Sequence, residues 1–301
     1  DVEYLLGLRD QLTALLEERG RLGWALAECE ALRAKGDGTP LATSTVTGSW
    51  NAIGDLDNDG RPEVVAASPG THSLGIWHLD SEGKAVTVRA AVDLNAPFDP
   101  LGCGPLTSYP NGYPGGGPPT IADFNGDGVP DVALAGGIGY AIFDGKKLMD
   151  PSVADKDVFL WSKKTQDCSS AATGSSIFDF NGDGKAEVLY SDEVRFRIYD
   201  GPTGDVLFET CNTTGTLIEY PIVADVDGDN NTEIVVAAND LTHQGGNVCP
   251  YPAAQARHGV FVYGDKQDRW VRTRRLWNQH SYHVTNINND GTIPAQEPAS
   301  W

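Results

Sequence analysis

The sequence predicts an all-β fold built from a repeated antiparallel unit, preceded by an α-helical segment. Three observations support this prediction. Apolar residues follow a helical period only near the start of the chain, an acidic motif recurs four times after residue 45, and short apolar strands flank each copy. The 301 residues also include 35 Gly and 18 Pro, a content typical of many turns between short strands.

The first 38 residues are predicted to form an amphipathic helical segment. Leucines recur at spacings of three and four, which places them on one helical face: Leu5, Leu8, Leu12, Leu15, Leu22 and Leu26. We expect residues 3–35 to pack on their own domain or on another chain. The stretch KGDGTPLATST has the composition of a linker, so the second predicted domain covers residues 39–301.

Four segments of this second domain share one pattern. They read WNAIGDLDNDGRPEVVAAS, PTIADFNGDGVPDVALAGG, SSIFDFNGDGKAEVLYSDE and PIVADVDGDNNTEIVVAAN. Each contains a short apolar strand, an acidic loop and a second apolar strand, and a further strand such as GYAIFDG or VRFRIYDG follows. One copy therefore supplies about four short antiparallel strands, the content of one propeller blade. Such a unit buries its faces only against neighbours, so the prediction is a β-propeller with at least four motif-bearing blades.

The acidic loops have the spacing of metal ligands. Positions one, three and five carry Asp or Asn, and position nine carries an acid. The predicted side-chain ligands are Asp55, Asp57, Asp59 and Glu63; Asp123, Asn125, Asp127 and Asp131; Asp179, Asn181, Asp183 and Glu187; and Asp225, Asp227, Asp229 and Glu233. Alternating carboxylates in a curled loop offer the all-oxygen shell that a hard cation prefers. We expect about four Ca²⁺ ions, and Mg²⁺ is disfavoured because it gives up its water reluctantly.

Position six of each loop supports a tight turn. It holds Gly60, Gly128 and Gly184 in the first three loops and Asn230 in the fourth, all residues that tolerate positive φ. An EF-hand would instead need a Glu at position twelve and flanking helices. Position twelve lies inside apolar strands here, so the sequence does not predict an EF-hand.

The ninth-position acid at the start of a strand resembles the FG-GAP (VCBS-type) repeat of integrin-α-like β-propellers. The resemblance covers residues 45–265. It implies that position seven contributes a backbone carbonyl to the ion, from Arg61, Val129, Lys185 and Asn231. It also implies a recognition or adhesion function at the cell surface or outside the cell, with the periplasm as an alternative. Integrin-like rings typically have seven blades, so the number of blades and the closure of the ring stay open.

A fifth segment, NINNDGTIP, looks like a decayed copy of the loop. Asn286, Asn288 and Asp290 occupy positions one, three and five, but Pro294 stands where the acid should be. We therefore expect a structural turn there, with weak metal binding or none.

The net charge of the chain limits the classes of partner that it is expected to bind. It has 22 Lys+Arg against 42 Asp+Glu, a formal charge of −20. That charge argues against nucleic acid and anionic lipid as partners, and no apolar run is long enough to cross a bilayer. A protein or a carbohydrate is the expected ligand. The five cysteines contain no C-x-x-C pair, and four follow residue 100 in polar connections, so we predict disulfides of open connectivity in an oxidising compartment.

The densest group of reactive side chains lies in RWVRTRRLWNQHSYHVTN. Trp277, His280, Tyr282 and His283 are candidates for ligand binding, and Trp277 and Tyr282 could form a platform for a sugar ring. The alternative interpretation is a packed closing region whose arginines pair with the many acids. The sequence has no G-x-S-x-G, P-loop or H-E-x-x-H motif. We therefore favour a secreted recognition module over an enzyme.

Two alternative functions stay open. The first is a lyase- or hydrolase-like enzyme on the same scaffold, using the group of His280, Tyr282 and Arg275. The second is a structural subunit of an extracellular assembly, packed through the N-terminal helix.

Overall fold

The computed structural model describes residues 50–68, 71–94, 96, 116–136, 139–167, 173–216, 219–239, 258–277, 282 and 285–294. The chain divides into two compact units, residues 1–43 and 44–301. All described residues lie in the second unit. The predicted helix over residues 3–35 lies outside the described residues.

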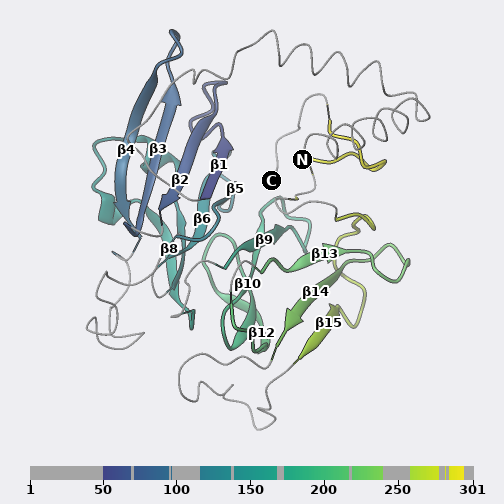
Figure 1. The fold of residues 1–301 in the computed structure, drawn as a ribbon. Coiled ribbons are helices and arrows are strands. Elements are labelled where there is room, and N and C mark those ends of the chain that lie inside the picture. Colours follow the sequence, from purple (N-terminus) through teal and green to yellow (C-terminus); the bar gives the residue numbers. More distant parts are fainter. Residues whose placement is uncertain are drawn as a thin grey trace, which may run out of the picture. The chain divides into compact units, whose positions relative to one another are not determined.

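Four antiparallel sheets follow one another along the chain (Figure 1). Sheet A contains β1 (Trp50–Gly54), β2 (Glu63–Ser68), β3 (Ser73–Leu79) and β4 (Ala85–Asp93). Sheet B contains β5 (Thr120–Ala122), β6 (Asp131–Gly136), β7 (Gly139–Phe143) and β8 (Phe159–Lys164). Sheet C contains β9 (Ser175–Phe178), β10 (Glu187–Ser191), β11 (Arg195–Tyr199) and β12 (Val206–Cys211). Sheet D contains β13 (Ile222–Ala224), β14 (Glu233–Ala238) and β15 (Gly259–Gly264).

Within each sheet the strands pair in sequence order, from first to last. The described part of the chain is thus all-β, as predicted. Its helices are the short α3 (Gly145–Met149) and the 3₁₀ turn η3 (Asp155–Asp157), both between β7 and β8. Among the described residues no helix has the length and apolar character needed to cross a membrane.

Alternation along the strands explains how the sheets pack. In β6, Val132 and Leu134 join an apolar core with sheet A, whereas Ala133 and Ala135 join a second core with sheet C. Successive side chains of a strand point to opposite faces, so a strand with apolar residues at every position is buried on both sides. A third core lies between sheets C and D.

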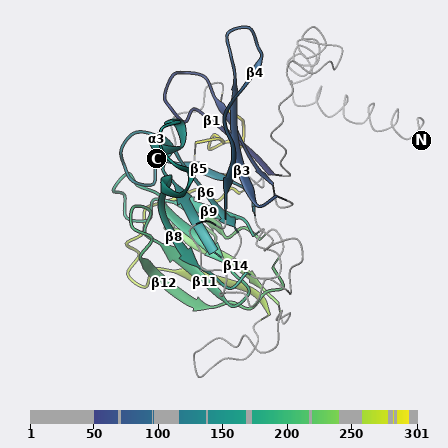
Figure 2. The same cartoon turned by 90° about the vertical axis from the view of Figure 1, so that its left-hand side faces the viewer.

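The first strands of consecutive sheets also lie against one another, β1 with β5, β5 with β9 and β9 with β13. Figure 2 shows the same sheets from the side. The repeat predicted consecutive antiparallel units that pack against their neighbours, and the sheets pack face to face with contacts between their first strands. Closure into a ring stays a prediction.

Sheet D has three strands among the described residues, so a fourth strand in this unit stays a prediction. The chain that follows β15 turns away at Asp265, whose carboxylate pairs with Arg269 at 2.8 Å. It then runs toward sheet C, where the Val271 amide donates to the Phe180 carbonyl at 3.0 Å.

Candidate metal centres

The four acidic loops occupy the same place in each sheet, between the first and second strand. We name them loop 1 (55–62), loop 2 (123–130), loop 3 (179–186) and loop 4 (225–232). The acid at position nine is the first residue of the second strand in all four: Glu63, Asp131, Glu187 and Glu233. The second strand therefore fixes the backbone of position nine, whereas positions one, three and five lie in the loop.

Position six adopts the left-handed conformation predicted from its residue types. The φ angles are +85° at Gly60, +82° at Gly128, +84° at Gly184 and +74° at Asn230. Sequence reasoning missed a second such position. Position four is also left-handed, with φ of +59°, +76°, +77° and +91° at Asn58, Gly126, Gly182 and Gly228. The signal was present in the sequence, since position four holds only Asn or Gly.

The first carboxylate of each loop closes the turn. Its Oδ2 atom accepts a hydrogen bond from the backbone amide of position six, at 2.9, 2.7, 2.8 and 3.2 Å in loops 1 to 4. The carboxylate at position five accepts a hydrogen bond from the backbone amide of position seven, at 2.8, 3.0, 3.0 and 2.7 Å in loops 1 to 4. Four copies of one hydrogen-bond pattern show that the four loops share one conformation.

The ninth acid links the two ends of each loop. One of its oxygens accepts from the amide of position two, at 2.8, 3.2, 2.7 and 3.0 Å in loops 1 to 4. Glu63, Asp131 and Glu187 are almost completely buried. Burial raises the pKa of Asp131 and of Glu187 to about 7, although hydrogen bonds from the backbone oppose this shift. Burial also raises the pKa of Glu63 and of Glu233.

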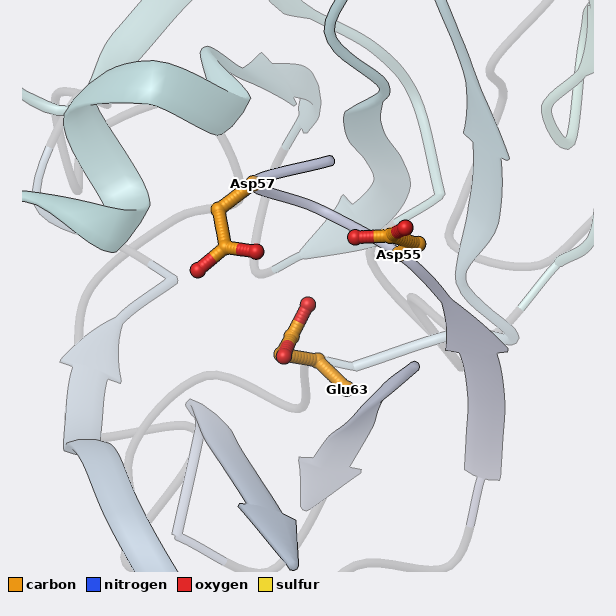
Figure 3. Close-up of side chains that lie close together, drawn as sticks. All are labelled: Asp55, Asp57 and Glu63. Carbon is orange, nitrogen blue, oxygen red and sulfur yellow. The ribbon is translucent and has the colours of Figure 1, made fainter. Parts of the chain in front are cut away.

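Oxygen atoms converge in loop 1. One carboxylate oxygen from each of Asp55, Asp57 and Glu63 lies within 4.8 Å of the others, and Figure 3 shows the three groups pointing into a common space. The Oε1 atom of Glu63 is buried and accepts no hydrogen bond in the structure; His78 Nδ1 lies 3.5 Å away. A buried carboxylate oxygen without a donor, beside two further carboxylates, fits a hard cation.

Loop 4 brings together Asp225, Asp227 and Asp229 within the same 4.8 Å limit. Loops 2 and 3 carry Asn at position three, which supplies an amide oxygen in place of a carboxylate. The position-seven carbonyls of Arg61, Val129, Lys185 and Asn231 remain predicted ligands.

Two loops receive a cationic side chain from elsewhere in the chain. Lys146 Nζ lies 2.8 Å from Asp127 Oδ2 in loop 2, and Arg275 Nε lies 3.1 Å from Asp225 Oδ2 in loop 4. Hydrogen bonds, from Lys146 in one case and Arg275 in the other, hold the pKa of Asp127 and of Asp225 below the usual value, although burial alone would raise both. These pairs reduce the repulsion among the loop carboxylates.

The decayed fifth copy forms a hydrogen-bonded turn. The Thr292 amide donates to Asp290 Oδ1 at 3.0 Å, as position seven does to position five in the four loops. Gly291, at position six, has φ of +82°. Pro294 offers no side-chain oxygen at position nine, so the turn lacks the acid that links the ends of the other loops.

The C-terminal aromatic candidates are packed against each other. The rings of Trp277 and Tyr282 have centroids 4.5 Å apart, and Trp277 packs against the core between sheets C and D. Arg275 contacts loop 4, through the Asp225 carboxylate and the Gly228 carbonyl. His280 and His283 lie outside the described residues.

Cys211 is the one cysteine among the described residues. It is buried beside Val194. The disulfides and their connectivity stay a prediction.

Comparison with solved structures gives distant similarities. The biofilm matrix protein Bap1 of V. cholerae is 26% identical with a TM-score of 0.45, over 82% of this chain and 35% of that protein. A Bacillus licheniformis rhamnogalacturonan lyase is 15% identical with a TM-score of 0.34, over 62% of this chain and 39% of the lyase. The exotype rhamnogalacturonan lyase YesX is 13% identical with a TM-score of 0.32, over 75% of this chain and 49% of that one. The chain thus spans less than half of each of these structures, and no curated protein matched it.

A family model identifies the repeats directly. The model described as FG-GAP-like repeat matches residues 55–134 and 179–236. These two stretches contain all four acidic loops and all or most of the strand that follows each loop. Residues 55–134 and 179–236 are therefore FG-GAP-like repeats.

Proposed function

We propose that this chain is a calcium-binding β-repeat module that acts outside the cell or at its surface, where it recognises a protein or a glycan. The observation that carries the proposal is the fourfold recurrence of one loop conformation with an acid at position nine, which is buried in loops 1 to 3. A bound calcium ion would supply the positive charge that each group of carboxylates needs. The resemblance to extracellular FG-GAP proteins supports the location.

Within each loop, the residues have separable tasks. Positions one, three, five and nine would bind the ion through side-chain oxygens, and position seven through its carbonyl. The amides of positions five to seven already orient carboxylates in all four loops, so little loop conformation has to be ordered when the ion binds. Four sites would add eight positive charges to a chain of formal charge −20. We infer a structural role for the ion, which would hold together the hairpin between the first two strands.

Single-loop variants test the metal assignment. Asp57→Ala, Asp127→Ala, Asp183→Ala and Asp227→Ala each remove one ligand from one loop. Each should reduce the number of Ca²⁺ ions bound at saturation by one, as counted by isothermal titration. Asp205→Ala on the exposed β11–β12 turn is the control and should leave the number unchanged. A count that does not fall in any loop variant would contradict the assignment.

Recognition is tested separately. A glycan microarray probed with the labelled chain in Ca²⁺ and in EDTA should show binding that is lost on chelation. Binding that persists in EDTA would contradict a metal-dependent recognition surface.

A further inference from the structure

A segment of the chain after β15 crosses the end of the sheets where loops 3 and 4 lie. We name residues 270–277 the strap. Its Val271 amide donates to the Phe180 carbonyl in loop 3 at 3.0 Å, and the Asp225 amide of loop 4 donates to the Arg274 carbonyl at 3.2 Å. The ring of Trp270 lies with its centroid 4.8 Å from that of Phe180. The strap therefore joins two neighbouring loops.

Arg275 is the part of the strap that meets a predicted metal ligand. Its Nε donates to Asp225 Oδ2 at 3.1 Å, and its Nη2 donates to the Gly228 carbonyl at 2.8 Å. A side chain at Gly228 would obstruct this contact, because a Cβ there would lie 2.9 Å from Nη2 of Arg275. Asp225 is the first residue of loop 4 and its side chain is 2% exposed, whereas that of Arg275 is 65% exposed.

Loop 1 provides the comparison. Its four acids match those of loop 4 in number and type. Three of its carboxylates, those of Asp55, Asp57 and Glu63, also converge within the same 4.8 Å limit. Among the described side chains, no cationic group pairs with Asp55, the counterpart of Asp225. The two loops thus differ at position one in the presence of a fixed positive charge.

We propose that Arg275 competes with calcium for Asp225, so that filling loop 4 displaces the guanidinium and loosens the strap. This inference rests on the proposed function, in which the loops bind calcium. A Ca²⁺ ion binds carboxylate oxygen at 2.3–2.6 Å, which would place two positive groups on one carboxylate. Their mutual repulsion is strongest where water is scarce, as it is around the buried carboxylate of Asp225.

The test measures calcium affinity at loop 4. Arg275→Gln removes the charge and keeps a hydrogen-bond donor, and should tighten one of the four sites by roughly two- to fivefold, the range of a surface ion pair. Arg275→Lys keeps the charge and should bind as the wild type does. Arg272→Gln, an exposed residue of the same strap, is the matched control and should change nothing. In an Asp227→Ala background, which lacks the loop 4 site, Arg275→Gln should have no effect on the remaining sites.

Hydrogen exchange supplies a second readout. Amides of residues 270–277 in the wild type should exchange faster in Ca²⁺ than in EDTA, and Arg275→Gln should already exchange fast in EDTA. If the four sites bind calcium but Arg275→Gln leaves loop 4 unchanged or weaker, or if calcium slows exchange in the strap, the inference is overturned while the proposed function stands. If no site binds calcium, both are overturned.

Discussion

At the scale of single residues, burial raises the pKa of the acid at position nine in each loop. Asp131 and Glu187 are buried beside other carboxylates, and burial raises the pKa of each to about 7. In the metal-free chain, both groups hold a proton in the folded state at a pH where the unfolded chain has already lost it. Metal-free stability should therefore fall as the pH rises from about 4 to about 7. The calcium affinity should instead rise with pH over this range, because protons compete with the ion for the carboxylates.

We expect the calcium affinity of loops 2 and 3 to be roughly tenfold lower at pH 6 than at pH 8, since the proton must leave before the ion binds. Calcium titrations at the two pH values measure this. Glu187→Gln removes the titrating group of loop 3, so the variant should lose that loop's pH dependence together with much of its affinity. Equal affinities for these loops at both pH values would contradict the assignment of Asp131 and Glu187 as ligands.

Position six gives a second prediction at this scale. A Cβ at Gly128 would meet nothing within 4 Å, yet the φ angle there is +82°. Gly128→Ala should therefore lower the free energy of unfolding by about 1–2 kcal/mol through backbone strain alone. Gly128→Asn should cost less than half as much, because Asn230 occupies the same conformation in loop 4. Urea unfolding in saturating Ca²⁺ compares the two variants, and equal costs would show that strain at φ is not the cause.

At the scale of structural elements, one side chain holds the β7–β8 connection on sheet A. Arg89 in β4 donates to the carbonyls of Leu148 and Asp150 at 2.9 and 2.5 Å. It also donates to the Lys147 and Val153 carbonyls, each at 2.9 Å, and pairs with Asp155 at 2.7 Å. The carbonyls at the end of α3 have no partners within the helix, so the guanidinium takes the place of a helix cap.

Arg89→Ala should lower the free energy of unfolding by about 3 kcal/mol, because it leaves buried carbonyls without donors. Lys156→Ala, an exposed residue of η3, should change it by no more than about 0.5 kcal/mol. Chemical denaturation of both variants tests this. A cost for Arg89→Ala as small as that of the control would mean that the connection is held by its apolar contacts instead.

At the scale of the whole second unit, the loops contact one another. Asn58 Nδ2 in loop 1 donates to the Gly128 carbonyl of loop 2 at 2.7 Å. A Cβ at Gly126 of loop 2 would come within 2.9 Å of Lys185 Cε in loop 3. The strap extends this chain of contacts from loop 3 to loop 4. The four candidate sites therefore lie at one end of the stacked sheets.

The sequence was sufficient for the four repeats, the place of each loop between two strands and the turn at position six, because each depends on residues close together in the chain. Contacts between residues far apart in the chain could not be predicted from the sequence. The pair of Arg275 with Asp225, for example, joins positions 50 residues apart. The positive φ at position four could have been predicted from Asn58 and the three glycines.

The most direct test of the central claim is a count of bound ions together with thermal unfolding. Native mass spectrometry of the chain in Ca²⁺ should show about four ions. A site filled at a hundred times its Kd adds about 2.7 kcal/mol to the free energy of unfolding. The melting temperature should thus fall sharply in EDTA, and Mg²⁺ should not restore it. A chain that binds no calcium and melts at the same temperature in Ca²⁺, Mg²⁺ and EDTA would contradict the account.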